Sequence, residues 1–212
     1  VDAPVTAGDS ASLLARDSIT QTDLGDVTAG NTIDVQAFNG SITMAGHATD
    51  LGMNAVSTTG GGAADNIRYR AFGQIELGIL NAGDGDVSII SETESIVDAQ
   101  NDLIGVDRNA PDNLTGFATL DTDGDGADDL PRIENVRADE LRLYANVSVG
   151  EPMDGLPGTP EENTADPLDT AVNQLAAETE NGSLYILETD GLSIERVAPV
   201  DVQRVALQSD TA

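Results

Sequence analysis

Apolar and polar residues alternate along short runs of this chain, and small polar corners separate the runs. Two of them, Ile75, Leu77 and Ile79 and then Val87 and Ile89, flank a turn of Asn, Gly and Asp. Further alternating runs are "SLLA", "DSITQ", "NIRYRA" and "DELRLYANVSV". Alternation over about four to eight residues is typical of half-buried β-strands. The sequence therefore predicts an all-β chain.

One phrase, a Gly and a polar residue followed by alternating aliphatic residues, recurs along the chain. It occurs as "GSITM" at Gly40, "GQIEL" at Gly73, "GDVSI" at Gly85 and "GSLYI" at Gly182. The corners between runs vary in length and lack the two-residue Asn-Gly turn of tight hairpins. Short strands joined by such corners can stack as the coils of a parallel β-helix. A β-sandwich also shows alternating strands and turn residues, so the pattern leaves both folds open.

The alternation also predicts which side chains point inward. One continuous apolar column is expected from Ile42, Ile75, Leu77, Val87, Ile89 and Ile186. Aromatic residues make up only 3% of the chain and Trp is absent. The core must therefore consist of Val, Ile, Leu and Ala, which suits narrow stacked layers.

Two segments interrupt the rhythm of strands. Residues 100–135 are rich in Asp, Asn and Gly, and residues 150–167 hold four of the eight prolines. Insertions into stacked repeats fall in the loops. The sequence thus predicts a single segment, residues 1–212, with two loop insertions. The stretch "LDTAVNQLAAETE" after Pro167 has helical apolar spacing, while its setting between strands favours another strand.

The charge of the chain limits its partners. There are 38 acidic residues and nine basic ones, all Arg, which gives a formal net charge of −29. Such a chain repels nucleic-acid phosphates and anionic membranes. The excess of Asp over Glu fits turns and calcium loops better than helix surfaces. A salt-adapted surface that holds no specific metal would explain the acidity equally well.

The absence of Cys excludes both a disulfide framework and a thiol nucleophile. No apolar run approaches the roughly 18 residues of a membrane span, and no charged-then-apolar signal segment is present. The opening "VDAPVTAGDS" has no Met. We therefore expect a segment of a longer protein.

Three phrases, in order, carry a resemblance to a known family. They are "NIRYRAFGQIELGILNAGDGDVSIISETESIVDA", "NVRADELRLYANVSVG" and "DPLDTAVNQLAAETENGSLYILETDGLSIERV". Together they resemble the filamentous-haemagglutinin-like repeats of giant secreted bacterial surface proteins, over about residues 25–197. The resemblance implies a right-handed parallel β-helix, displayed outside the cell as an adhesin or structural stalk. It also favours the strand interpretation after Pro167, and it implies open ends that neighbouring β-helix segments or further copies of the chain would cover.

The acidic stretch "DTDGDGADD" is the strongest local motif. Several carboxylates surround the sharp turn that Gly126 permits, and calcium prefers six to eight oxygen ligands. As an EF-hand loop it would place Arg132 where a bidentate carboxylate belongs. As D-x-D-x-D-G-x-x-D it is similar to the calcium repeats of thrombospondin type 3 domains. The predicted ligands are Asp121, Asp123, Asp125, Asp128 and Asp129, with the carbonyl oxygen of Ala127. The predicted role of this calcium is structural.

Two weaker candidates have simpler explanations. The corner "NAGDGD", Asn81 to Asp86, could contact a cation, but Asp and Gly are also what a turn requires. The single histidine, His47, has no Cys or second His to form a metal site with. We expect it to flank a surface turn.

A carbohydrate-cleaving or carbohydrate-binding β-helix is the alternative function. Lyases of that kind pair calcium with a basic residue, and hydrolases use clustered carboxylates. The candidate bases are Arg68, Arg70, Arg137 and Arg142. The motifs "RYR" and "RLY" are more simply outward-facing Arg beside inward-facing core residues, and Tyr69, Tyr144 and Tyr185 each lie inside an alternating run. The sequence therefore predicts a non-enzymatic, calcium-stabilised structural or adhesive segment of an extracellular bacterial surface protein.

Overall fold

The computed structural model describes residues 1–22, 24–44, 55–99, 134–150, 167–189 and 191–205. Within these ranges the chain forms β-strands and no helix. Every strand pair in them is parallel. The all-β prediction is confirmed. Parallel pairing disagrees with the β-sandwich alternative, whose sheets are antiparallel.

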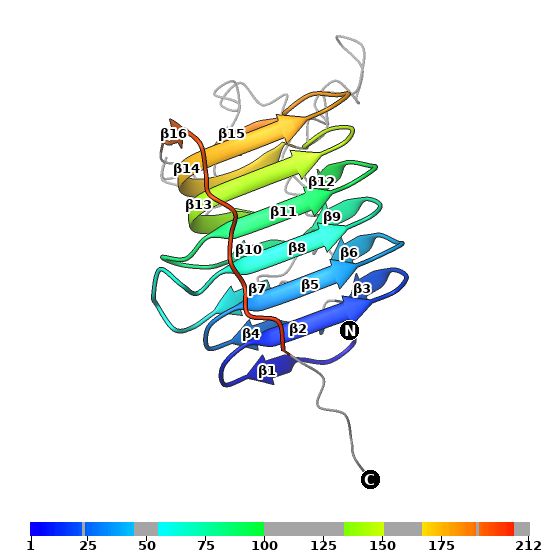
Figure 1. Cartoon of the computed structure of the whole chain (residues 1–212), viewed down its shortest axis with the longest axis vertical. Coiled ribbons are helices and arrows are strands. Elements are labelled where there is room, and N and C mark those ends of the chain that lie inside the picture. The colour runs from blue at the N-terminus through cyan, green and yellow to red at the C-terminus, as the bar shows by residue number, and fades with distance from the viewer. Residues whose placement is uncertain (23, 45–54, 100–133, 151–166, 190, 206–212) are drawn as a thin grey trace, which may run out of the picture.

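The strands follow one another in sets, and each set stacks on the one before it (Figure 1). We call each set a tier and number the tiers along the chain. The first tier is β1 (Val5–Ala7), β2 (Ala11–Ala15) and β3 (Ile19–Gln21). The second is β4 (Val27–Ala29), β5 (Ile33–Ala37) and β6 (Ile42–Met44). The third is β7 (Ala55–Thr58), β8 (Ile67–Ala71) and β9 (Ile75–Leu77). The fourth is β10 (Ile79–Asn81), β11 (Val87–Ser91) and β12 (Ile96–Asp98).

The fifth and sixth tiers each consist of one long strand, and the seventh of two short ones. In the fifth tier, β13 (Val136–Ala145) pairs with β10 through its first residues and with β11 through its last. In the sixth, β14 (Leu168–Thr179) pairs with β13 along nearly its whole length. The seventh tier, β15 (Ile186–Glu188) and β16 (Ser193–Ile194), pairs with the two halves of β14. One stack is β1, β4, β7 and β10, and another is β2, β5, β8 and β11. The long strand β13 pairs with both stacks and joins them into one 12-stranded sheet, beside a second sheet of β3, β6, β9 and β12.

Equivalent residues of successive tiers lie directly over one another. In the four-stranded sheet, Ile19 pairs with Ile42, Ile42 with Ile75, and Ile75 with Ile96. An isolated bridge continues this column from Ile96 to Val149. Because neighbouring strands are about 4.8 Å apart, each tier adds one such step to the stack. The alternation of the sequence is thus repeated in register from tier to tier.

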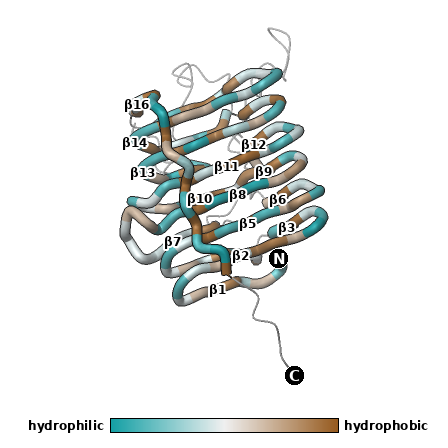
Figure 2. The backbone as a smooth tube through the Cα atoms, viewed as in Figure 1, coloured by the Kyte–Doolittle hydropathy of each residue, from teal (hydrophilic) through white to brown (hydrophobic). Residues whose placement is uncertain are grey.

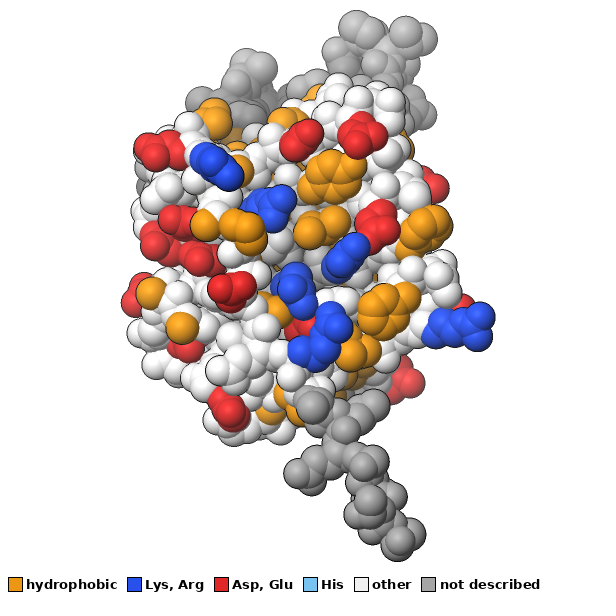
Figure 3. Space-filling model, viewed as in Figure 1, with side chains coloured by type: hydrophobic (Ala, Val, Ile, Leu, Met, Phe, Trp, Pro, Cys, Tyr) orange, Lys and Arg blue, Asp and Glu red, His pale blue; other side chains and the backbone are white. Residues whose placement is uncertain are grey.

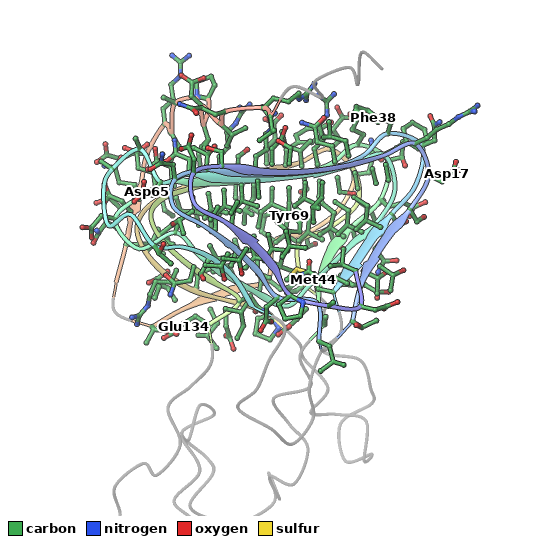
Figure 4. All side chains as sticks on the ribbon, turned by 90° about the horizontal axis from the view of Figure 1, so that it is seen from below. Asp17, Phe38, Met44, Asp65, Tyr69 and Glu134 are labelled. Carbon is green, nitrogen blue, oxygen red and sulfur yellow. The ribbon has the colours of Figure 1, made fainter. Side chains whose placement is uncertain are left out.

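The core lies inside the stack of strands. Hydrophobic and hydrophilic positions alternate along the strands in Figure 2, and Figure 4 shows Tyr69 in the interior. Five predicted inward residues, Ile42, Ile75, Leu77, Val87 and Ile89, are fully buried. The sixth, Ile186, is only half-buried and packs against the edge of the core. The predicted inward placement is confirmed except at this upper end, but the residues form several columns on two sheets rather than one continuous column.

The stretch after Pro167 is a strand. Strand β14 covers Leu168–Thr179, and Leu168, Val172 and Leu175 are all buried in the core. Their spacing resembles a helix, but every residue from Thr170 to Thr179 other than Asn173 has a register partner in β13. The strand interpretation is confirmed.

Glycine precedes several strands because successive tiers approach closely there. A Cβ atom on Gly182 would overlap the carbonyl oxygen of Val147 in the tier below. A Cβ atom on Gly85 would lie 2.5 Å from the carbonyl oxygen of Asp65, which is also closer than real Cβ atoms come. The repeated Gly of the sequence therefore marks corners where only a hydrogen fits.

The chain leaves the four-stranded side of the stack at one corner in several tiers. The described residues on either side of 45–54 belong to β6 and β7, and those on either side of 100–133 follow β12 and precede β13. Residues 151–166 are flanked by Gly150, next to the bridging Val149, and by Pro167 before β14. Both predicted insertions therefore begin and end at this corner. Most of their residues lie outside the described ranges.

Candidate functional surface

The outer face of β2, β5, β8, β11, β13 and β14 carries three of the four candidate bases, Arg68, Arg70 and Arg142. In "RYR", Tyr69 points into the core while Arg68 and Arg70 point outward, as the alternation predicts. In "RLY", Leu143 is buried while Arg142 and Tyr144 lie on the outer side. Figure 3 shows basic, acidic and hydrophobic side chains together on this face. The fourth candidate base, Arg137, is exposed in the other half of β13.

A buried carboxylate lies on the outer side of this sheet, in the second tier. Asp34 on β5 is completely buried. Its Oδ1 accepts a hydrogen bond from Nε of Arg68 at 3.0 Å, and its Oδ2 accepts one from Nη2 at 3.0 Å. The side-chain amide of Gln36 also donates to Oδ1, at 2.8 Å. A buried charge is tolerated only when it is paired and hydrogen-bonded in this way.

The C-terminal segment 195–205, which we call the strap, lies across the same face. Figure 1 shows it as the red trace that passes from β16 over the strands toward β2. It begins directly after β16 of the seventh tier, and the backbone amide of Glu195 donates to the carbonyl oxygen of Leu175 in the sixth tier at 3.1 Å. Two residues of the strap, Val197 and Val200, are buried. The strap thus covers part of the sheet with its own apolar side chains.

Side chains of the first three tiers hold the far end of the strap. The amide of Asn66 donates to the carbonyl oxygen of Asp201 at 2.9 Å. The backbone amide of Gln203 donates to Oγ1 of Thr32 at 2.9 Å. Nε of Arg204 donates to Oδ2 of Asp34 at 3.3 Å. Sheet backbone groups are already used by neighbouring strands, so polar side chains make these contacts instead.

The two tyrosines of the motifs have different environments. Burial raises the pKa of Tyr69, whose hydroxyl donates to Oε1 of Gln21 at 3.2 Å. Tyr69 is therefore a core residue that no ligand can reach from outside. Tyr144 lies on the outer face, and its hydroxyl donates to Oε1 of Glu180 at 2.8 Å. That hydrogen bond is the main cause of the raised pKa of Tyr144.

The corner Asn81 to Asp86 forms a turn between β10 and β11. Oδ1 of Asn81 accepts a hydrogen bond from the amide of Gly83, which has a φ of 60°, so glycine is required there. Asp86 lies near Glu140 of the next tier. Burial and the negative charges of Glu140 and Asp139 raise the pKa of Asp86. Among the described residues, no group of three or more His, Asp or Glu side chains could hold a metal ion.

A buried amide anchors the corner from which the insertions start. Asn135 is fully buried, and its side-chain nitrogen donates to Oδ1 of Asp98 at 2.6 Å and to the carbonyl oxygen of Leu77 at 3.2 Å. Its Oδ1 accepts a hydrogen bond from the amide of Asp169 at 2.8 Å. Asn135 therefore connects the third, fourth and sixth tiers. The sequence places it at the end of an insertion, whereas the structure shows it within the stack.

The predicted calcium ligands and the histidine lie outside the described residues. The predicted ligands are Asp121, Asp123, Asp125, Asp128 and Asp129, and His47 lies in the stretch 45–54. Their roles stay predictions. Asn135, which directly precedes β13, shows only that the chain returns to the stack next to Asp98, at the end of β12.

Sequence reasoning missed the strap and its partners. Asp34 is the acidic residue of the run "TIDVQA", and charged residues are unfavourable inside strands unless something pairs with them. That signal could have identified Asp34 as a special position. Nothing local could have identified Arg204, because 170 positions separate it from Asp34.

The arginines of this face differ in their partners. Arg68 is held by a buried carboxylate, and Arg70 contacts Oε1 of Glu92 through Nε at 2.7 Å. Arg142 has no ion-pair partner among the described residues. None of the described segments forms an apolar helix long enough to cross a membrane. Comparisons of the chain with protein-family models, with curated proteins and with solved structures found no match.

Proposed function

We propose that the chain is a structural, non-enzymatic segment of a right-handed parallel β-helix. The observation that carries this proposal is the register that repeats from tier to tier, for example from Val5 to Val27, Val56, Leu80 and Val136. Connections between parallel strands of one sheet are right-handed in nearly all proteins. A stack of this kind grows by about 4.8 Å per tier, so its natural use is to span distance.

The proposed work of the segment is reach and display on the outside of a bacterial cell. Straight stacks present their corners and outer faces at regular intervals, and insertions at one corner add surface without disturbing the tiers. The phrases that resemble filamentous-haemagglutinin-like repeats support an extracellular surface protein. Neighbouring β-helix segments or further copies of the chain are the proposed partners.

We also propose that calcium stiffens the acidic insertion. Five carboxylates within Asp121 to Asp129 would repel one another strongly without a cation. Extracellular calcium sites are often weak, with dissociation constants on the order of 0.1 to 1 mM. Such a site would be occupied outside a cell and would explain part of the charge of −29.

A glycan assay separates this proposal from the alternative of a carbohydrate-binding or carbohydrate-cleaving protein. The full chain is incubated in millimolar calcium with neutral and acidic polysaccharides, and both new chain ends and shifts in melting temperature are measured. We expect neither cleavage nor a shift. Cleavage or binding that Arg142→Ala abolishes, and that Arg137→Ala on the other half of β13 leaves intact, would establish the alternative.

A further inference from the structure

An apolar stripe runs along the outer face, beside the strap. Successive tiers from the first to the fifth each contribute one large side chain to it: Leu14, Phe38, Phe72, Ile90 and Tyr144. Leu14 is 41% exposed, Phe38 52% and Phe72 46%. Figure 4 shows Phe38 on the outer side of the sheet, opposite the interior that contains Tyr69. Leu14, Ile90 and Tyr144 belong to one outward column, and Phe38 and Phe72 belong to the next. A cluster of exposed apolar side chains on one face marks an interaction surface more often than single exposed residues do.

The strap leaves this stripe uncovered. Apart from the bond between Glu195 and Leu175 in the sixth tier, its described hydrogen bonds go to Ser12, Thr32, Asp34 and Asn66, which are at the start of their strands or just before them. The stripe lies two to six positions further along the chain in each tier, so roughly 7 to 20 Å away. The strap and the stripe therefore divide the outer face between them.

The charges around the stripe are balanced, unlike those of the chain. The three outward columns of this face contain four basic residues, Arg16, Arg68, Arg70 and Arg142. They contain four acidic residues, Asp34, Glu92, Glu178 and Glu180. The face is thus formally neutral, whereas the whole chain carries −29. Two of the acidic residues are neutralised directly, Asp34 by Arg68 and Glu92 by Arg70.

We propose that the stripe is the contact between two copies of this chain lying side by side. Two molecules that each carry −29 repel one another, so they can approach only where the local charge is near zero and apolar area is available. A two-fold axis through the middle tier of the stripe would bring the same surface of both copies together, as in the interface of a symmetric dimer. Arg142 provides an uncompensated cation for an acidic group of the other copy, such as Glu178.

The size of the stripe predicts a weak association. From Leu14 to Tyr144 it spans four tier steps, or about 19 Å. An area about 19 Å long and three residues wide is smaller than the roughly 800 Å² per partner of a standard stable interface. The dimer should therefore be reversible. Added salt should strengthen it, because salt screens the repulsion between the two net charges.

This inference deepens the proposed structural role by assigning a lateral contact, and sedimentation velocity of the full chain tests it. The wild type should dimerise reversibly at high protein concentration, and more at high than at low sodium chloride. Phe72→Glu should weaken dimerisation by at least about tenfold, because the charge would enter the centre of the stripe. Phe38→Glu, one tier away, should do the same.

The matched control is Leu24→Glu, which adds the same charge at an apolar residue that is 65% exposed away from the stripe. It should leave the dimer unchanged. A wild type that stays monomeric at every concentration and salt level would overturn the inference, as would a dimer that survives both Phe variants. A monomer whose stripe gains hydrogen-exchange protection from a glycan would also overturn it. Circular dichroism of each variant shows whether the stack is folded, so failure of the contact is distinct from failure of the proposed fold.

Discussion

Nε of Arg204 lies 3.3 Å from Oδ2 of Asp34, although 170 positions separate the two residues in the chain. Asp34 belongs to the second tier, and the strap that carries Arg204 starts after β16 of the seventh. The strap therefore ties the two ends of a stack whose other contacts are almost all between adjacent tiers. In a stack stabilised mainly by nearest neighbours, such a connection should make the tiers unfold more cooperatively.

The first prediction concerns the unequal contributions of the two arginines at Asp34. Arg68→Gln should lower the free energy of unfolding by about 2–3 kcal/mol, because it removes two hydrogen bonds and leaves a buried carboxylate poorly paired. Arg204→Gln should cost less than about 1 kcal/mol, because this side chain is 49% exposed and makes one long contact. Urea unfolding of both variants measures the difference. Equal losses, or a larger loss for Arg204→Gln, would contradict the geometry at Asp34.

The second prediction concerns the core. Ile89→Asp should destabilise the chain by about 3–5 kcal/mol, because Ile89 is fully buried between Tyr69 and Leu143 and the new charge would have no partner. Ile194→Asp is the control, since Ile194 is 83% exposed, and it should change stability by less than about 0.5 kcal/mol. Thermal and urea unfolding measure both. Similar melting temperatures for Ile89→Asp and the wild type would disprove the inward placement of this column.

The third prediction concerns pH. Burial and the nearby carboxylates of Glu140 and Asp139 raise the pKa of Asp86 above its usual value of 3.8. Folding therefore favours the protonated form. The contribution of this group to stability is fully present below the unfolded pKa and is lost as pH rises through the folded pKa.

Asp86→Asn removes this titration while keeping the shape of the side chain. It should make the chain more stable than the wild type at neutral pH, and the gain should disappear in acid. The gain should also shrink in high salt, because salt screens the repulsion from Glu140. Stability measured as a function of pH and salt tests both statements. A variant that is less stable than the wild type at neutral pH would show that the carboxylate of Asp86 is favourable.

The fourth prediction concerns calcium. If Asp121, Asp123, Asp125 and Asp128 converge on one ion, chelation should lower hydrogen-exchange protection around residues 117–134 and leave the tiers folded. Binding stabilises the folded form by roughly 2.7 kcal/mol when calcium exceeds its dissociation constant a hundredfold. The double variant Asp123→Ala and Asp125→Ala should exchange like the chelated wild type and ignore added chelator. If magnesium or plain salt protects the segment as well as calcium does, the segment is a screened acidic loop.

Much of the fold could be predicted from local alternation. The runs around Ile75, Leu77, Val87 and Ile89 identify both the strands and their inward faces, because side chains of a strand alternate strictly between its two sides. Apolar spacing misleads only where strands are long. In Leu168–Thr179 the buried residues Leu168, Val172 and Leu175 mimic a helix, and pairing with β13 decides in favour of the strand.

The outer surface could not be predicted in the same way. That Phe38 and Phe72 are neighbours depends on the number of residues that each tier uses, and this number varies with the corners. The position of the strap is even harder to predict from local sequence. Its partners Thr32 and Asn66 precede strands far earlier in the chain, and the alternation of the sequence contains no information about them. Long-range contacts between a strap and side chains require the folded register.

The spacing of the tiers can be measured directly, and it distinguishes a stack of parallel strands from other folds. The chain has no Cys, so pairs of nitroxide labels can be placed at chosen positions without background. Thr6, Thr28, Ser57, Asn81, Arg137 and Ala171 form one outward column in register. Double electron–electron resonance should give a backbone separation of about 19 Å for the Thr6 and Arg137 pair and about 24 Å for Thr6 and Ala171. Distances that do not increase by about one strand spacing from the first pair to the second would contradict the stack of parallel tiers.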